Sequence, residues 1–109
     1  MFKINQSPTF TRDVSIQIPD GEGFTEAELK TTFRAMPISE ADGFDLSTGT
    51  GTLDFLKAVV VSFDNLVDDD DNHVPSTPEQ ISQELDKAYV RLGLVSGYFK
   101  GLHKGTLGN

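Results

Sequence analysis

Two stretches of alternating apolar and polar residues, separated by a turn, constrain the fold of this chain more than any other feature of its sequence. The first stretch predicts a half-buried strand, because its apolar residues occupy every second position: Val14, Ile16 and Ile18. Residues 19–23, Pro-Asp-Gly-Glu-Gly, have the composition of a turn. Alternation then resumes from Ala27 to Met36, so the sequence predicts an antiparallel β-hairpin over residues 12–36.

The second of these stretches also fits a helix. Leu29, Phe33 and Met36 lie at helical spacing, and Thr25 with Glu28 has the pattern of a capping box. We favour the strand because the alternation is longer and because the preceding strand and turn supply a hairpin partner. The helical alternative stays open at this point.

Helix signals dominate the chain after Pro37. Residues 37–52 predict a loop that contains one short helical turn, because Gly, Ser and Thr are frequent there. From residue 53 apolar side chains recur at spacings of three and four, which predicts a helix: Leu53, Leu56, Val60 and Phe63. Another helix is predicted to start at Thr77, since Pro78 suits the first helical position and Gln80 completes a capping box.

The closing helix carries an apolar stripe with heptad-like spacing. Its members follow one another at intervals of three and four residues: Leu85, Ala88, Leu92, Val95, Phe99 and Leu102. Two interpretations are compatible: the stripe faces the core of the domain, or part of it pairs with another subunit. Gly93 and Gly97 each weaken an isolated helix by roughly 1 kcal/mol, so this helix requires packing partners.

These signals predict one α+β domain spanning residues 1–109, with an N-terminal antiparallel β-hairpin followed by a small bundle of three to four helices. The expected segments are an arm at 1–11, the hairpin at 12–36, the loop at 37–52, a helical part at 53–104 and a tail at 105–109. The expected core comprises Ile16, Ile18, Leu29, Phe33, Leu56, Val60, Phe63, Leu92, Val95 and Phe99.

The charged residues are unevenly distributed. The net charge is −8, from 17 acids and 9 bases, and all the acids lie at or before Asp86. Lys87, Arg91, Lys100 and Lys104 follow without an acid. Such an acidic chain repels phosphate backbones, which argues against nucleic-acid binding. The absence of cysteine excludes disulfides, thiolate metal sites and thiol catalysis.

An acidic segment resembles a calcium-binding loop only in part. Asp68, Asp70 and Asn72 match the first three ligand positions of an EF-hand, and Glu79 falls where the bidentate glutamate belongs. The sixth position requires a sharply turning glycine, but His73 stands there. We therefore expect a solvated loop without a metal.

No other motif indicates catalysis or a cofactor. The glycines between residues 43 and 51 lack the lysine of a phosphate-binding loop, and neither histidine belongs to an acid–nucleophile constellation. We expect no catalytic residue, no cofactor and no enzymatic activity. No apolar run approaches the ~20 residues of a membrane helix, and the N-terminus lacks the pattern of a signal peptide, so we expect a soluble cytoplasmic protein.

Several segments occur in an order that is typical of one protein family. They are Phe2–Phe10, the strand Val14–Pro19, Leu29–Pro37, Val59–Leu66, the acidic turn Asp68–Asp71, the helix start Val74–Pro78 and the aromatic pair Tyr98-Phe99. In these segments the chain resembles the short tail assembly chaperones of long-tailed bacteriophages and prophages. It differs in having Phe63 where the family pattern has tryptophan, and in its Gly/Thr-rich insert at 47–52.

The resemblance implies a non-enzymatic assembly factor. Such a protein coats the tape measure protein, keeps its hydrophobic helices soluble, helps to recruit tail tube subunits and leaves before the virion is finished. The expected location is the cytoplasm of the bacterial host, without membrane or nucleic-acid partners. Two other classes stay open: an acidic DNA mimic that inhibits a host nucleic-acid-binding protein, and a structural head–tail joining subunit.

The charge distribution also predicts a surface for partners and self-association. The acidic part comprises Asp68, Asp69, Asp70 and Asp71. The helical part comprises Tyr98, Phe99, Lys100, Leu102 and Lys104. A contact between two such different patches is heterologous, so it builds a ring or an open spiral of copies.

Overall fold

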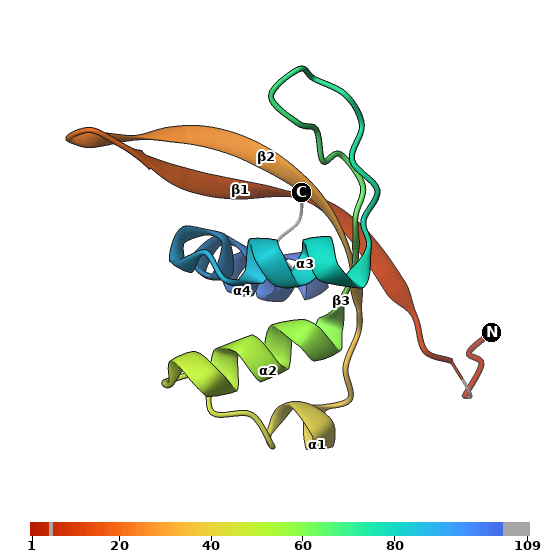
Figure 1. Ribbon diagram of the computed structural model, residues 1–109. Coiled ribbons are helices and arrows are strands. Elements are labelled where there is room, and N and C mark those ends of the chain that lie inside the picture. Colours follow the sequence, from red (N-terminus) through yellow and green to blue (C-terminus); the bar gives the residue numbers. More distant parts are fainter. Residues whose placement is uncertain (5, 104–109) are drawn as a thin grey trace.

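The computed structural model describes residues 1–4 and 6–103, which form a three-stranded antiparallel sheet and four helices (Figure 1). The predicted α+β class is therefore confirmed, while the predicted tail at 105–109 lies outside the described residues. The elements follow the order β1 (Thr9–Asp20), β2 (Gly23–Arg34), α1 (Ile38–Ala41), α2 (Gly49–Val59), β3 (Val60–Phe63), α3 (Pro78–Leu85) and α4 (Ala88–Leu102).

The hairpin of β1 and β2 settles the ambiguity of residues 26–36 in favour of a strand. Its two strands have twelve residues each and pair in continuous register from Thr9↔Arg34 to Asp20↔Gly23, further than predicted. Gly21 has a φ of 64° at the first central position of the two-residue turn. A positive φ there matches a type II′ turn, whose twist suits a hairpin.

The strand β3 corrects the prediction that residues 53–104 are helical throughout. Residues 60–63 leave the helix and pair antiparallel with β2, including Thr31↔Phe63. The helical spacing of Val60 and Phe63 was misleading, because the run of β-branched valines at 59–61 prefers a pleated surface. Asn65 extends this edge, since its side chain accepts from Lys30 N at 2.8 Å and donates to Glu28 O at 2.9 Å.

The helix α2 begins four residues earlier than predicted. Residues 49–52 form its first turn instead of a loop, and the Thr48 hydroxyl caps it by accepting from Gly51 N at 3.0 Å. A Cβ on Gly51 would lie 1.9 Å from Asp45 O, so only glycine fits here. The Gly/Thr-rich composition therefore marks a tightly packed helix start.

The C-terminal part consists of two helices rather than one. Thr77 caps α3 as predicted, accepting from Gln80 N at 3.1 Å, although the Gln80 side chain bonds Glu84 rather than returning to the cap. The helix stops at Leu85, and α4 starts after Lys87. Arg91 connects α4 to α3 and to α2, because its guanidinium donates to Leu85 O at the end of α3 and to Gly49 O at the start of α2.

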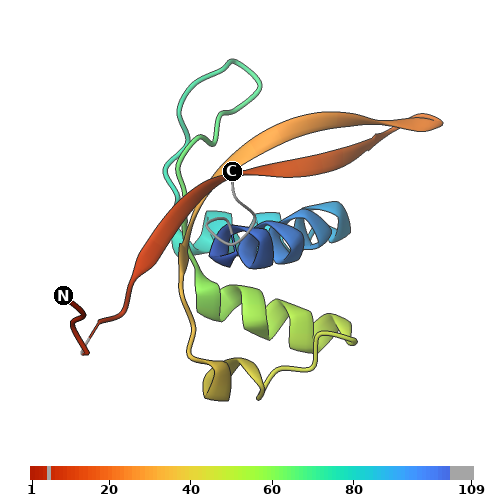
Figure 2. The same cartoon turned by 180° about the vertical axis from the view of Figure 1, so that it is seen from behind.

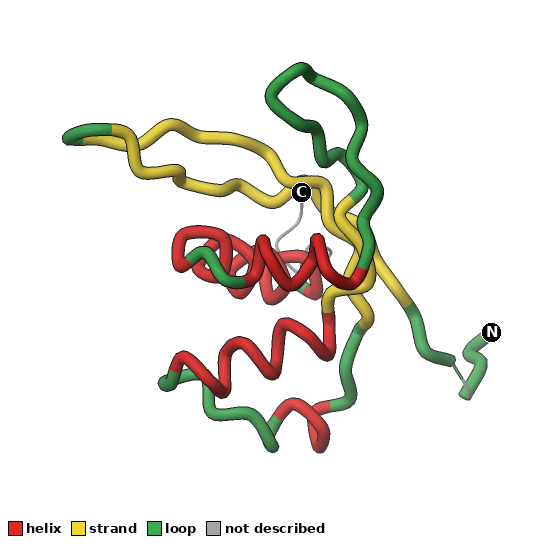
Figure 3. Tube along the Cα trace, viewed as in Figure 1, coloured by secondary structure: helices red, strands yellow, loops and turns green. Residues whose placement is uncertain are grey.

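The core lies between the sheet and the helices, with α3 and α4 between the hairpin and α2 (Figures 1 and 3). Its buried members are Val14, Ile16, Phe33, Met36, Phe55, Leu56, Val59, Val60, Phe63, Leu85, Val90, Leu94 and Tyr98. Three predicted core residues are only partly buried: Ile18, Leu29 and Val95. The prediction is wrong for Leu92 and Phe99, which are 75% and 38% exposed.

Three glycines let α4 lie against β1. A Cβ on Gly93 would lie 2.8 Å from Ser15 O, and one on Gly97 would lie 2.8 Å from Val14 Cγ2. A Cβ on Gly101 would lie 2.6 Å from Phe10 Cε2. The glycines that weaken α4 in isolation therefore create its contact surface, which agrees with the expectation that this helix requires packing partners.

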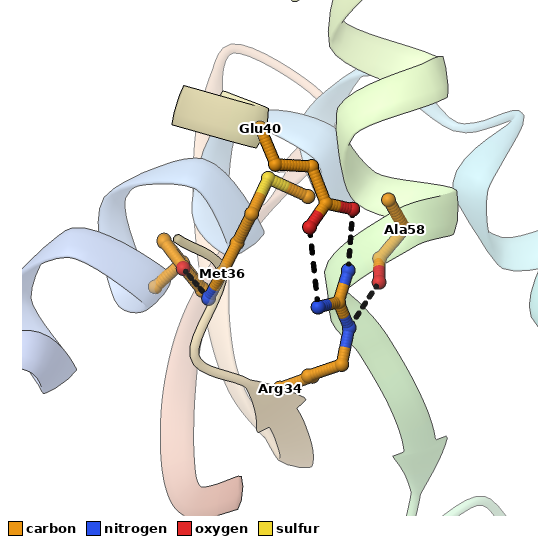
Figure 4. A network of polar contacts seen from close by, with 5 residues as sticks. Arg34, Met36, Glu40 and Ala58 are labelled. Atoms are coloured by element: carbon orange, nitrogen blue, oxygen red, sulfur yellow. Dashed lines mark hydrogen bonds and ion pairs between the residues drawn. The ribbon is translucent and has the colours of Figure 1, made fainter. Parts of the chain in front are cut away.

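A polar network fixes the connection from the sheet to α1 and α2 (Figure 4). The Arg34 guanidinium donates to both carboxylate oxygens of Glu40, at 2.9 and 3.4 Å. It also donates to Ala58 O at 3.3 Å. Next to it, Met36 N donates to the buried hydroxyl of Tyr98 at 2.9 Å. The chain after β2 is therefore tied to α4 and to the last turn of α2.

Candidate partner-binding surface

The heptad-like stripe of α4 lies on the side of the helix that faces away from the sheet. We call it the α4 ridge, with the members Ala88, Leu92, Val95, Phe99 and Leu102. At about 100° per residue, these positions lie opposite the face formed by Gly93, Gly97 and Gly101, which contacts β1. The sequence pattern was correct in its period, but the ridge is largely an external surface.

The ridge is apolar and exposed along its length. Leu92 is 75% exposed, Leu102 is 43% exposed, and Ala88 is also exposed. Phe99 presents one side to solvent while its ring stacks on Phe55, with centroids 5.8 Å apart. Val95 is half-buried. The contact of Phe99 with Phe55 holds the ridge against α2.

Two grooves flank the ridge. The strand groove, of about 1090 Å³, lies between β1 and α4 and includes Pro19, Phe24 and Tyr89 in its lining. The helix groove, of about 800 Å³, lies between α4 and the start of α2 and includes Leu46 and Val95. Ala88, Leu92 and Ser96 line both grooves, so the ridge forms their shared wall.

The predicted acidic patch lies apart from the ridge. The loop that carries Asp68, Asp69, Asp70 and Asp71 projects beyond the sheet, on the side away from α4, in both opposed views (Figures 1 and 2). All four aspartates are exposed. The two predicted patches therefore do not meet within one chain. A contact between neighbouring copies requires them to be apart in this way.

Hydrogen bonds give the acidic loop a fixed shape. The Asp68 carboxylate accepts from the backbone N–H groups of Asp70 and Asn72, both at 2.9 Å, and Val67 pairs with His73. The bond from the Asn72 backbone is the main reason that the pKa of Asp68 is lowered. Within the described ranges, no group of three or more His, Asp or Glu side chains is arranged to hold a metal ion.

The basic surface formed by the residues after Asp86 is smaller than the sequence indicates. Lys87 pairs with Glu84 at 2.8 Å, a hydrogen bond that raises the pKa of Lys87. Arg91 bonds carbonyl groups of its own chain, and Lys104 lies outside the described residues. Lys100 therefore carries the predicted basic patch on the described surface, where it lines the strand groove.

Tyr98 does not belong to this surface. It is 2% exposed, and its ring contacts those of Phe10, Phe33 and Phe55 with centroids 5.2–5.7 Å apart. Its burial corrects the expectation that Tyr98 meets a partner directly. Of the predicted helical patch, Phe99, Lys100 and Leu102 are the described residues that a partner reaches.

No protein-family model matches the chain, and no curated protein or solved structure matches it significantly. None of the helices within residues 1–4 and 6–103 combines the length and the apolar character that crossing a membrane requires. The α4 ridge and its grooves are therefore the strongest candidate site, since they expose apolar side chains at regular helical spacing.

Proposed function

We propose that this protein is a tail assembly chaperone of a long-tailed bacteriophage or prophage. In this proposal it binds the hydrophobic helices of the tape measure protein, helps to recruit tail tube subunits and departs before the virion is complete. It acts in the cytoplasm of the bacterial host and without enzymatic activity. The observation that carries the proposal is the exposed apolar ridge on α4, together with the family resemblance of the sequence.

The ridge suits an amphipathic helix as its ligand. Helices bind to grooves through apolar residues at spacings of three and four, which is also the spacing of the ridge. A partner helix that lies in either groove buries Leu92, because this side chain belongs to the wall that the grooves share. The tape measure protein, whose long helices need to be kept soluble, is a partner of this kind.

Co-expression with the tape measure protein of the same phage tests the proposal. The soluble yield of the tape measure protein should rise with the wild-type chain and fall back with Leu92→Asp. Ile38→Asp is the matched control, because Ile38 is 79% exposed, close to the 75% of Leu92, and lies on α1 away from the ridge. A wild-type chain without effect on solubility overturns the function, and equal effects of both variants overturn the role of the ridge.

We also propose that copies of the chain associate head to tail, with the acidic loop of one copy near the basic end of α4 in the next. Each exposed ion pair contributes only ~0.2–1 kcal/mol and is screened by salt. Sedimentation should therefore show weaker association at high ionic strength and with Lys100→Glu. Oligomers that are indifferent to salt and to this variant would rule out the electrostatic contact.

A further inference from the structure

Two cations lie together at one end of the strand groove. The Arg12 guanidinium donates to Gly101 O at 3.3 Å and to Thr11 O at 2.7 Å, which holds it beside the last turn of α4. Lys100 belongs to this turn and lines the same groove. Within residues 1–4 and 6–103, no carboxylate forms an ion pair with either side chain. The Arg12 Nε atom is also buried without a hydrogen-bond partner in the described structure.

The charge at this end of the groove is positive overall. Asp13 also lines the groove, but its side chain points to the opposite face of β1 from Arg12, because successive side chains of a strand alternate. On that face Asp13 lies across from Lys30 of β2. The C-terminus of α4 contributes about half of an elementary negative charge, which is less than the two cations supply. This end of the groove therefore suits an anionic ligand.

The acidic loop has the complementary charge and a fixed shape. Asp69, Asp70 and Asp71 are exposed and form no ion pair in the described part of the chain. The Asp68 carboxylate is already occupied within the loop, since it accepts from the backbone N–H groups of Asp70 and Asn72. Because these bonds order the loop before it binds, it loses less conformational freedom on binding than a flexible acidic segment does.

The loop faces away from the groove of its own chain. It projects beyond the sheet on the side away from α4, whereas the strand groove lies between β1 and α4 (Figures 1 and 2). The groove of a second copy has no such restriction. Apolar surface is available on both sides of such a contact, because Val67 at the base of the loop is 57% exposed and Tyr89 and Leu92 line the groove.

We propose that the acidic loop of one copy lies in the strand groove of a second copy, with its aspartates next to Arg12 and Lys100. Asp69, Asp70 and Asp71 make the contact, and Asp68 is a positioning residue that holds the loop in shape. The inference rests on the self-association part of the proposed function and adds a defined binding site, which includes a residue of β1. It leaves the helix groove, on the other side of the α4 ridge, to the partner helix.

A mixture of two variants tests whether these two surfaces meet. Asp69→Asn with Asp70→Asn and Asp71→Asn removes the loop charges but keeps Asp68, and Lys100→Glu reverses a charge of the groove. Each variant alone should self-associate at least ten-fold more weakly than the wild type in sedimentation. An equimolar mixture should form a 1:1 complex, because it still contains one intact loop and one intact groove. A mixture that stays monomeric where the wild type associates overturns the contact, and leaves the groove to an acidic group of another protein.

The matched control removes three acids that do not line the groove. Glu22→Gln with Glu26→Gln and Glu28→Gln takes the same charge from the distal half of the hairpin, where all three side chains are exposed. This variant should associate no more weakly than the wild type. An equal loss in both triple variants would show that net charge alone governs association, and would overturn the proposal.

Arg12 separates this inference from the proposed function. Arg12→Gln removes the charge on β1 and should weaken self-association at least ten-fold, whereas Arg12→Lys keeps the charge and should retain most of it. If Lys100→Glu weakens association and Arg12→Gln does not, the electrostatic contact of the proposed function stands and the strand groove is not its binding site. A monomeric wild-type chain overturns both. Neither result affects the helix-binding test, which measures the solubility of the tape measure protein.

Discussion

At the scale of single residues, Phe63 and Phe99 show that helical spacing does not by itself predict burial. Both belong to apolar stripes of helical spacing, but only Phe63 is buried. Phe63 is 1% exposed, so Phe63→Ala should cost about 3–5 kcal/mol of unfolding free energy. Phe99 is 38% exposed and packs on one side against Phe55, so Phe99→Ala should cost clearly less than Phe63→Ala. Urea unfolding of both variants checks the order, and an equal loss would show that Phe99 is a core residue after all.

The Tyr98 hydroxyl is expected to stabilise the fold through one buried hydrogen bond. Tyr98→Phe keeps the ring contacts but leaves Met36 N–H without its acceptor, which costs about 1–3 kcal/mol. Tyr89→Phe is the matched control, since the half-buried Tyr89 makes no side-chain hydrogen bond within the described residues. Thermal unfolding of the two variants should therefore separate, and coinciding curves would contradict this role.

The alternating strand pattern predicted which face of the hairpin is buried, although Ile18 and Leu29 on that face are only partly buried. Ile16 and Phe33 were predicted correctly, because alternation fixes which face of a strand is buried. Sequence analysis failed for Leu92 because a helix with apolar residues all round offers two stripes, and spacing alone does not show which one meets the sheet. The glycines at 93, 97 and 101 were the missed signal, since they mark where another backbone comes close.

At the scale of elements, the glycine face of α4 should not tolerate side chains. Gly97→Ala gains about 1 kcal/mol of helix propensity but forces a contact with Val14, and overpacking of this kind costs about 1–3 kcal/mol. We therefore expect a net loss of stability. Gly49→Ala is the control, because its Cβ would lie 3.9 Å from Arg91 in ordinary contact. Chemical denaturation checks both, and a stabilised Gly97→Ala would contradict the close packing.

The errors at element boundaries have different physical origins. Residues 60–63 match a helical stripe, yet the open edge of β2 recruits them into the sheet because β-branched side chains favour it. Residues 49–52 look like a flexible linker, yet Thr48 and the narrow space at Gly51 make them a helix start. At residues 60–63 a distant strand decides the local structure, which a single sequence does not display. At residues 49–52 the deciding contacts, with Thr48 and Asp45, are local.

At the scale of the whole molecule, stability should fall in acid partly through two exposed aspartates. Hydrogen bonds from Ser47 lower the pKa of Asp45 below its usual 3.8, and backbone bonds do the same for Asp68. A lowered pKa in the folded state stabilises the protein above the unfolded value, and this contribution disappears as the pH falls through the folded value. The stability gap between the wild type and Asp45→Asn should therefore be present at pH 7 and close below pH 3.8. Urea midpoints across that range measure it, and a constant gap would contradict the role of the charge.

The candidate site could be predicted from sequence in its parts but not in its arrangement. The heptad-like stripe and the acidic loop were both recognisable, since each is a local pattern. Their positions on opposite sides of the hairpin depend on how the chain returns from β3 to α4, and this path is set by packing. The strand groove was missed, because it exists only after α4 lies against β1.

The contact between β1 and α4 also dictates when the molecule can fold. It joins β1 to α4, so the apolar face of the hairpin stays uncovered until α4 has left the ribosome. At about 5–20 residues per second, that wait lasts seconds, during which open strand edges invite wrong pairing. Any chain cut short by premature termination before α4 would keep this face exposed and become a substrate for cellular quality-control proteases.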